Sequence, residues 1–254
     1  MINCLTAIAT PGSYSGRYDL ERIETLLNAQ IENSIELGWA QKDIKVLTNF
    51  EYGFMGIKAK KIESNPLCPT ASKMYGVRQV LEDEVVWSHD LDAWQNYWFD
   101  CPEFKDVGAG TYNYRKFNGG SIFWRPSGKD LMDKIIDMLE SETATYEENV
   151  LNRVFKANPK RVTMLNFTYN VGCSNYRQRW NDSNKPVKVL HFHPYNRIAW
   201  ETQALDRCEM GHKGIGDRLE SLLRKYYELA TELKENKNGN SVGIRHNPDK
   251  YLDL

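Results

Sequence analysis

Residues 84–92 read EVVWSHDLD and carry the strongest signal in this chain of 254 residues. An apolar run that includes Trp87 leads into two aspartates, Asp90 and Asp92. A short apolar run bounded by polar residues is typical of a buried strand. If the strand continues through the pair, both carboxylates lie on one side, because alternate residues of a strand share a face. If the chain turns there, the pair can still share one ion. The alternative to an ion-binding pair is a solvated acidic turn, and the surrounding sequence is needed to distinguish the two.

Strands and helices alternate over the first half of the chain. The pattern predicts a buried strand over 4–9, a helix from Leu20, a strand over 43–49 and a helix over 71–81. Alternation of this kind implies a mostly parallel sheet whose ligands bind at the carboxyl ends of the strands. We expect the 84–92 strand to be central, so it should deliver its aspartates to that edge.

The second half of the chain is less regular. Its pattern predicts a strand over 117–124, helices over 130–139 and 147–155, and a late strand over 187–192. Residues 216–236 carry one apolar stripe of an amphipathic helix, which we expect to pack on the domain because its polar face has mixed charge. No break in composition divides the chain, so we predict one domain over 1–236 and a tail over 237–254.

The overall composition excludes several classes of protein. Lys and Arg total 33 against 34 Asp and Glu, a formal net charge of −1, which argues against a nucleic-acid or polybasic membrane surface. No apolar run approaches the roughly 20 residues that span a bilayer, so we expect no integral membrane association. The five cysteines form no Cys-x-x-Cys pair, and no signal peptide is recognisable. We therefore expect reduced thiols and a cytoplasmic location, in the host cytosol if the source is viral.

Five motifs in a fixed order resemble those of GT-A glycosyltransferases, in the branch of glycogenin and the bacterial galactosyltransferases. They are the Asp-x-Asp at 90–92, FNGGSIFW at 117–124, EENVLN at 147–152, LNFTYN at 165–170 and VLHF at 189–192. The family's counterparts after the Asp-x-Asp are an Asn-x-Gly strand, a DQD-x-LN helix start, an LP-x-x-YN element and a late strand with His-Phe. The resemblance covers about residues 2–200.

The resemblance implies a fold, an activity and two substrates. The fold would be the Rossmann-like α/β GT-A fold, with a mostly parallel central sheet flanked by helices and a C-terminal helix. The activity would be that of a hexosyltransferase, with a nucleotide sugar, favoured as a UDP-sugar, as donor. The acceptor would be a glycan or another hydroxyl compound, and the anomeric configuration would be retained.

The same resemblance implies a metal site made of Asp90, Asp92 and His191. Carboxylates together with substrate phosphates bind Mg²⁺ or Mn²⁺, and an added imidazole shifts the preference towards Mn²⁺. We therefore expect Mn²⁺, with Mg²⁺ as the alternative. His193 is a rival ligand, because it follows two residues later on the same predicted strand face.

Several residues match positions at which the family binds its donor. Lys73 would meet the donor phosphate or sugar. Arg197, which stands where the family has lysine, would meet the diphosphate. Asp90 would share the metal with the diphosphate. The other candidates are Thr6 and Ala7 through their backbone, Tyr14 by stacking on the base, Asn49 at the ribose or base, and Asn118 at the donor sugar or acceptor.

Asp92 and Glu148 are the candidate catalytic residues. Glu148 is the carboxylate that we name as nucleophile or base, and an inverting reaction with Glu147 or Glu148 as base stays open. The alternative role for both glutamates is to cap a helix, since carboxylates are favourable in a first helical turn. The aromatic cluster Trp94, Tyr97, Trp98 and Phe99 is either an acceptor platform or core.

Two other functions remain compatible with these residues. A nucleotidyltransferase also uses paired aspartates, and residues 12–17 are a faint version of its glycine-rich loop. A catalytically degenerate module that binds a sugar or nucleotide is the other alternative. Neither a Gly-x-Gly-x-x-Gly fingerprint nor a Walker A lysine loop is present, which argues against a dinucleotide oxidoreductase or a P-loop kinase.

Overall fold

The computed structural model describes residues 1–9, 20–63, 69–113, 116–142, 147–172 and 176–191, and in addition Arg218, Ser221, Leu222 and Lys225. Four features named above lie outside these residues, namely Tyr14, the loop 12–17, the tail 237–254 and the segment with His193 and Arg197. So does the 216–236 helix, apart from the four residues just named.

The central sheet has seven strands. They are β1 (Ile2–Ala7), β2 (Ile44–Thr48), β5 (Lys60–Lys61), β6 (Val86–His89), β8 (Val107–Asn113), β9 (Lys116–Trp124) and β10 (Val162–Met164). Their order across the sheet is β10, β8, β9, β6, β1, β2 and β5. Within the described residues, β9 alone runs against the others. The predicted mostly parallel sheet, with β6 at its centre, is confirmed.

The sheet separates two apolar cores, as the alternation of side chains along its strands requires. Cys4 and Trp124 belong to one core, whereas their chain neighbours Leu5 and Phe123 belong to the other. The same alternation occurs on β6, where Val86 and Trp87 face opposite cores. Both faces of the sheet are therefore buried, which leaves its edges as the accessible parts.

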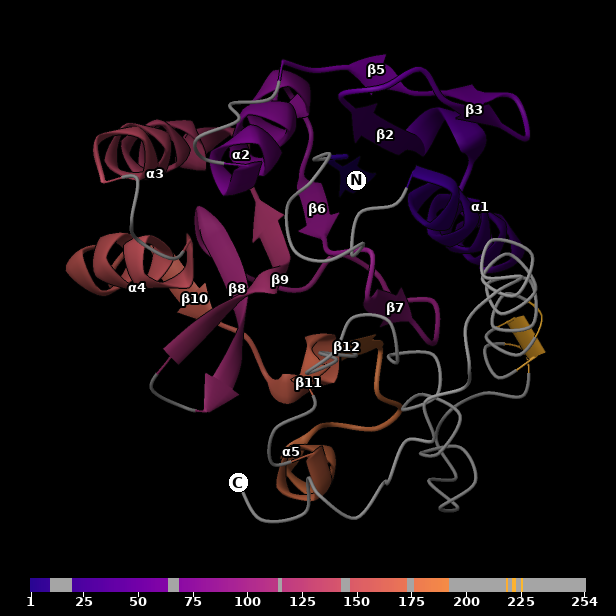
Figure 1. Cartoon of the computed structure of the whole chain (residues 1–254). Helices are drawn as coiled ribbons and strands as arrows, with labels where there is room; N and C mark the ends of the chain where they lie inside the picture. The colour runs from indigo at the N-terminus through magenta and orange to yellow at the C-terminus, as the bar shows by residue number, and fades with distance from the viewer. Residues whose placement is uncertain are drawn as a thin grey trace, which may run out of the picture.

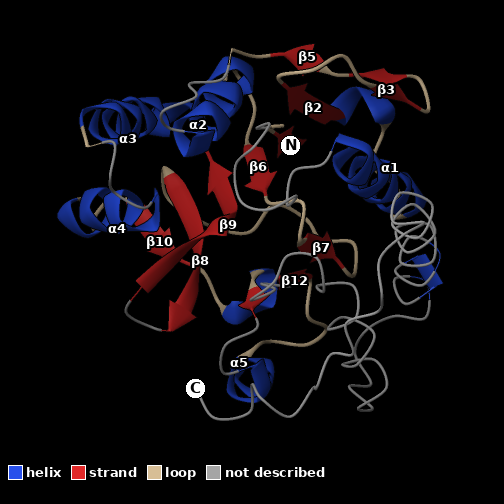
Figure 2. Cartoon of the chain, in the orientation of Figure 1, coloured by secondary structure: helices blue, strands red, loops and turns tan. Residues whose placement is uncertain are grey.

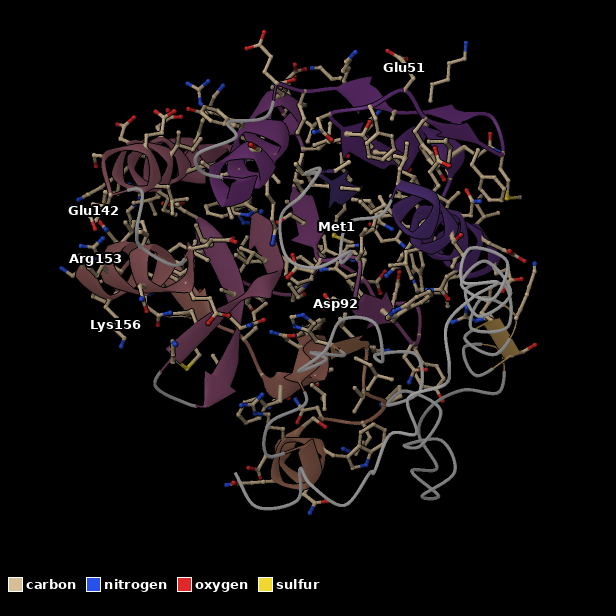
Figure 3. The ribbon with its side chains drawn as sticks, viewed as in Figure 1. Met1, Glu51, Asp92, Glu142, Arg153 and Lys156 are labelled. Carbon is tan, nitrogen blue, oxygen red and sulfur yellow. The ribbon has the colours of Figure 1, made fainter. Side chains whose placement is uncertain are left out.

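Four helices cover the two faces. They are α1 (Leu20–Glu36), α2 (Pro69–Val80), α3 (Lys129–Ser141) and α4 (Glu147–Ala157). Figures 1 and 2 show α2, α3 and α4 together on one side of the sheet and α1 on the other. Arg153 of α4 pairs with Glu142, just after α3, at 2.5 Å (Figure 3). Helix α1 ends before Gly38, whose φ of +101° favours glycine.

A second, three-stranded sheet lies next to the carboxyl end of β6 (Figure 1). Its strands are β11 (Val171–Gly172), β12 (Val189–His191) and β7 (Ala93–Gln95), in that order. Strand β12 is antiparallel to β7, with His191 opposite Ala93. Because β7 begins directly after Asp92, this pairing brings His191 to the acidic pair.

The remaining elements are short. They are the hairpin β3 (Gly53–Phe54) and β4 (Ile57–Lys58), helix α5 (Tyr176–Asp182), and the 3-10 turns η1 (Gln41–Asp43), η2 (Pro126–Gly128) and η3 (Phe167–Tyr169). Among the described residues, no helix has the length and apolar character needed to cross a membrane.

Three of the four described residues near the C-terminus contact the domain. Arg218 donates to the Asn96 carbonyl at 3.1 Å, and Lys225 pairs with Glu32 of α1 at 2.9 Å. Leu222 lies between them in sequence and is buried. These contacts place this part of the predicted amphipathic helix against α1.

Asn152 connects α4 to β9. Its Oδ1 accepts from the Phe117 N–H at 2.9 Å, and its Nδ2 donates to the Phe117 carbonyl at 2.9 Å and to the Glu148 carbonyl at 2.7 Å. The side chain is buried. One amide thus satisfies both backbone groups of a residue just before the Asn118-Gly119-Gly120 segment, and it fixes the distance between that segment and the start of α4.

We predict that Asn152→Ala lowers the free energy of unfolding by about 2–4 kcal/mol, because it leaves buried backbone groups without partners. Urea unfolding at constant pH measures this loss. The control is Asn158→Ala just after the same helix, where the side chain donates to the Val154 carbonyl at 2.8 Å. That variant should lose less than about 1.5 kcal/mol; equal losses in the two variants would contradict the prediction.

Candidate active site

The chain turns at the acidic pair instead of continuing as a strand. Strand β6 ends at His89, and the Asp90 N–H donates to the Gly120 carbonyl of β9 at 3.1 Å. The Ala93 N–H then donates to the Asp90 carbonyl at 3.0 Å, which closes a tight turn before β7. Figure 3 shows Asp92 at this turn, beside β7. Of the two arrangements considered from the sequence, the turn is the one that occurs.

Gln30 of α1 holds this turn from the other side. Its Nε2 donates to the carbonyls of Leu91 at 2.9 Å and Ala93 at 3.0 Å, the residues on either side of Asp92. Gln30 is buried. Its role was not predicted from the sequence. The signal that could have found it is its spacing, because it follows the buried Leu27 by three residues and so is a polar residue within the apolar stripe of the helix.

Asp90, Asp92 and His191 converge on one point. Each offers a ligand atom, and these atoms lie within 4.8 Å of one another. The His191 Nε2 is 3.3 Å from the Asp92 Oδ1 and 3.8 Å from the Asp90 Oδ2. Two carboxylate oxygens and one imidazole nitrogen form a donor set that suits a divalent cation such as Mn²⁺ or Mg²⁺. The three predicted metal ligands are therefore brought together; His193, the rival, lies outside the described residues.

The ring of His191 reaches this point because residue 120 is glycine. A Cβ built on Gly120 would lie 1.9 Å from the His191 Cε1, closer than two atoms can approach without bonding. The imidazole therefore packs directly on the backbone of β9. His191 is buried, so its position is set by packing and hydrogen bonds rather than by solvent.

Lys73 enters the site from α2. Its Nζ contacts the Asp90 Oδ1, donates to the Gly119 carbonyl at 2.9 Å and lies 3.7 Å from the Glu147 Oε1. Burial lowers the pKa of Lys73, but the charges of Asp90 and Glu147 outweigh it and leave the pKa raised. The ammonium group therefore stays charged and holds Asp90 against β9. Its predicted contact with a donor phosphate stays a prediction.

The two glutamates at the start of α4 have different surroundings. Burial raises the pKa of Glu147 to about 7, although the charge of Lys73 opposes this effect. Glu148 instead accepts from the Asn118 Nδ2 at 2.6 Å and lies 3.7 Å from the Lys116 Nζ. Glu147 is therefore the glutamate that faces Lys73 and Asp90, whereas Glu148 is connected to His191 through the side-chain amide of Asn118. From the sequence, Glu148 was the glutamate predicted to be catalytic.

Asn118 is the centre of a buried hydrogen-bond network. Its Oδ1 accepts from the Gly120 N–H at 2.9 Å and from the Asn170 Nδ2 at 2.7 Å, and it lies 3.1 Å from the His191 Nδ1. The Asn170 Oδ1 lies 3.0 Å from the same ring nitrogen. Asn170 ends the LNFTYN motif, and no role was predicted for it from the sequence. Donor binding by Asn118 stays a prediction.

The other predicted donor contacts lie along the carboxyl edge of the sheet. Thr6 and Ala7 end β1, and Asn49 follows β2. The Asn49 side chain pairs with both backbone groups of Ala9, at 2.8 and 2.7 Å, and so holds the chain just after β1. Beyond it is a surface cavity of about 650 Å³ lined by Asn49, Lys61, Ile62 and Glu63. Binding by these residues also stays a prediction.

Half of the aromatic cluster belongs to the core. Trp94 and Phe99 are buried, and Phe99 packs edge-on against Trp87 at 5.0 Å between ring centroids. Tyr97 is half-buried, and Trp98 is the exposed member, at 43%. The four rings therefore cannot form one acceptor platform.

The sheet order, the flanking helices and the acidic turn at the end of β6 give this chain the GT-A fold, as its motifs indicated. Solved structures with this fold include the galactosyltransferase LgtC in complex with donor and acceptor sugar analogues. It matches with a TM-score of 0.53 and 14% identity, over 87% of this chain and 100% of that one. No protein-family model and no curated protein sequence matches the chain.

Two further neighbours share the fold. One is a glycosyltransferase involved in glycosylation of the major capsid of PBCV-1, with a TM-score of 0.52 and 13% identity over 80% of this chain and 100% of that one. The other is the glycosyltransferase GlyE of Streptococcus pneumoniae TIGR4, with a TM-score of 0.54 and 12% identity over 96% of this chain and 66% of that one. At these identities the likeness establishes the fold alone.

We predict that Gly120→Ala weakens binding of Mn²⁺ by about tenfold or more, because the added methyl group displaces the His191 ring. Titration of free Mn²⁺ by electron paramagnetic resonance measures the affinity. Gly53→Ala is the control, since its Cβ would meet only the Ile57 carbonyl oxygen at an ordinary 3.6 Å. A folded Gly120→Ala protein that binds Mn²⁺ like the parent would refute this account of the site.

We predict that Glu147 contributes stability to the metal-free protein that is lost as the pH rises from about 4.5 to about 7. Over that range the folded protein keeps the Glu147 proton, whereas the unfolded chain, with the ordinary pKa of 4.5, has lost it. The contribution of Glu147 to the free energy of unfolding therefore falls with rising pH. Glu147→Gln should remove about 2–3 kcal/mol of that fall, measured by urea unfolding at both pH values. An unchanged pH dependence in the variant would show that Glu147 does not cause it.

Proposed function

We propose that the protein is a metal-dependent glycosyltransferase that transfers a sugar from a nucleoside-diphosphate donor to the hydroxyl group of a glycan or another acceptor. The observation that carries this proposal is the convergence of Asp90, Asp92 and His191 at the carboxyl edge of a GT-A sheet. Ligands of open α/β sheets bind at that edge. The GT-A neighbours, which are glycosyltransferases, support the same class of activity.

Asp90, Asp92 and His191 would hold the divalent cation, with Mn²⁺ proposed ahead of Mg²⁺ because of the imidazole. When bound, the cation supplies neutralisation of the charge that develops on the departing diphosphate. Lys73 holds Asp90 in place through its ammonium group and adds positive charge to the same side of the site. We propose that Arg197 adds a second cation there, because a guanidinium group binds phosphates in bidentate fashion.

The positions of the strand ends support a donor that lies along the edge of the sheet. From the acidic turn, the edge passes the end of β1 at Ala7 and then Asn49, just after β2, before it reaches the 650 Å³ cavity. We propose that Thr6 and Ala7 contact the nucleotide through their backbone and that Asn49 shapes its site by holding Ala9. Uridine as the base follows from the family resemblance, and Tyr14 is proposed to stack on it because it follows the first strand in the sequence.

Retention at the anomeric carbon is part of the proposal. In a double displacement, a Glu148 oxygen would bond to the anomeric carbon as the bond from that carbon to the diphosphate oxygen breaks. The acceptor hydroxyl would then displace the glutamate, and its proton would pass to an oxygen of the departed diphosphate. Proton NMR of the first product distinguishes the outcomes, because retention and inversion give opposite anomers. An inverted product would instead assign Glu147 or Glu148 as the base that deprotonates the acceptor.

Hydrolysis of a panel of UDP-, GDP- and dTDP-sugars tests the class of reaction. We expect release of a nucleoside diphosphate in the presence of Mn²⁺, and loss of that release in EDTA. If no sugar nucleotide is bound or cleaved with Mn²⁺, the proposal fails. A release of pyrophosphate from a nucleoside triphosphate and a sugar phosphate would identify a nucleotidyltransferase instead.

Asp92→Asn should lower the rate of donor cleavage by at least about a hundredfold, because the amide keeps the size of the side chain but removes an anionic metal ligand. Steady-state release of nucleoside diphosphate measures it. The matched control is Asp83→Asn, which makes the same change at an exposed residue after α2. If the Asp92→Asn protein binds donor and cleaves it as the parent does, the site is not the catalytic centre.

A further inference from the structure

We propose that Asn170, together with Asn118, is a positioning residue that fixes the tautomer of His191, with the proton on Nδ1 and the lone pair of Nε2 aimed at Asp90 and Asp92. This inference rests on the proposed metal site. It concerns the two asparagines, whose side-chain oxygens both lie within hydrogen-bond distance of the His191 ring.

The orientation of the Asn118 amide is determined by its neighbours. A backbone N–H can only donate, so the atom that the Gly120 N–H reaches at 2.9 Å must be the amide oxygen. At the other end of the amide, the Glu148 carboxylate accepts from the Nδ2 at 2.6 Å. Both contacts require the same orientation. The Asn118 Oδ1 therefore faces His191.

The orientation of Asn170 follows from that of Asn118. The Asn170 Nδ2 donates to the Asn118 Oδ1 at 2.7 Å, whereas the opposite orientation would place two amide oxygens against each other. The Asn170 Oδ1 then lies 3.0 Å from the His191 Nδ1, and the Asn118 Oδ1 lies 3.1 Å from it. Two oxygens with no proton to give surround this nitrogen, so the nitrogen itself carries the proton and donates.

A neutral imidazole has one N–H, so a proton on Nδ1 leaves the lone pair on Nε2. That nitrogen lies 3.3 Å from the Asp92 Oδ1 and 3.8 Å from the Asp90 Oδ2. The lone pairs of this nitrogen and of the two carboxylate oxygens then face one another. This arrangement is unfavourable when the site is empty and favourable when a cation lies between the three atoms. In metal sites generally, residues that hydrogen-bond to the second ring nitrogen of a metal-bound histidine fix its tautomer and the orientation of its ring.

The backbone is shaped to bring the asparagine and the histidine together. A Cβ on Gly110 of β8 would lie 2.5 Å from the Asn170 Cβ, and a Cβ on Gly120 would lie 1.9 Å from the His191 ring. Neither side chain could occupy its place beside a residue larger than glycine. Asn170 is 2% exposed and His191 1% exposed, so water does not compete for these bonds.

Nitrogen-15 NMR of the histidine rings tests the proposal on the unmodified protein. The protonated and unprotonated nitrogens of a neutral imidazole have well separated shifts, and the spectrum of His191→Gln assigns the signal. We expect a protonated Nδ1 in the metal-free protein at alkaline pH and in the Mg²⁺-loaded protein. A protonated Nε2 and bare Nδ1 in the metal-free protein would overturn the proposal. This measurement is independent of any activity.

Asn170→Leu tests the consequence for the metal. We expect the variant to bind Mn²⁺ about 10- to 100-fold more weakly by electron paramagnetic resonance and to show a mixture of His191 tautomers. The control is Asn166→Ala, which removes hydrogen bonds to Thr168 and Asn184 from the same segment but none to His191. It should lose stability while keeping the affinity and the tautomer.

The two proposals fail in different ways. A folded Asn170→Leu protein with unchanged Mn²⁺ affinity and an unchanged His191 tautomer would overturn the role of Asn170. If the parent protein shows the expected tautomer but neither binds Mn²⁺ nor cleaves sugar nucleotides, the proposed function is wrong and the hydrogen-bond assignment stands. If Asn170→Leu does not fold, Asn170→Ser, which has a shorter side chain, gives the same comparison.

Discussion

The packing of the His191 ring on the backbone of Gly120 is the constraint on which the candidate site depends. Residue 120 belongs to β9 of the central sheet and residue 191 to β12 of the small sheet, so this contact joins the two sheets. The small sheet is also connected through β7, which continues directly from the acidic turn after β6. The ligand positions are therefore set by backbone elements that close on one another, and a cation would enter a site that is already formed.

Charge around this contact is unbalanced without a cation. Four carboxylates face two ammonium groups among the described residues of the site, namely Asp90, Asp92, Glu147 and Glu148 against Lys73 and Lys116. The difference, four minus two, equals the charge of one divalent ion. Burial raises the pKa of Glu147, and the charges of Asp90 and Glu148 raise it further. A chain of net charge −1 can therefore place an anionic donor on a bound cation without a basic surface.

The parts of the fold that could be predicted from the sequence are the elements whose apolar residues repeat with the period of a helix or a strand. Apolar runs and the helical stripes identified β1, β2, β6 and the four main helices, because each is buried on faces that the period defines. Strand β8 was not predicted, since its sequence VGAGTYN contains two glycines, which weaken the β signal. One of them, Gly110, makes room for Asn170, so the residue that obscured the strand serves the site.

The site could be predicted only as far as residue types at fixed positions indicate chemistry. Two aspartates and a late histidine are visible in the sequence; the residues that orient them are not. Gln30 and Asn170 act through backbone carbonyls and a ring nitrogen that come from distant parts of the chain. Their polar side chains are buried, where each needs a partner. A buried amide beside candidate ligands is therefore informative, because the energy that its burial costs must be offset by hydrogen bonds, and here these fall on His191 or on the residues that flank Asp92.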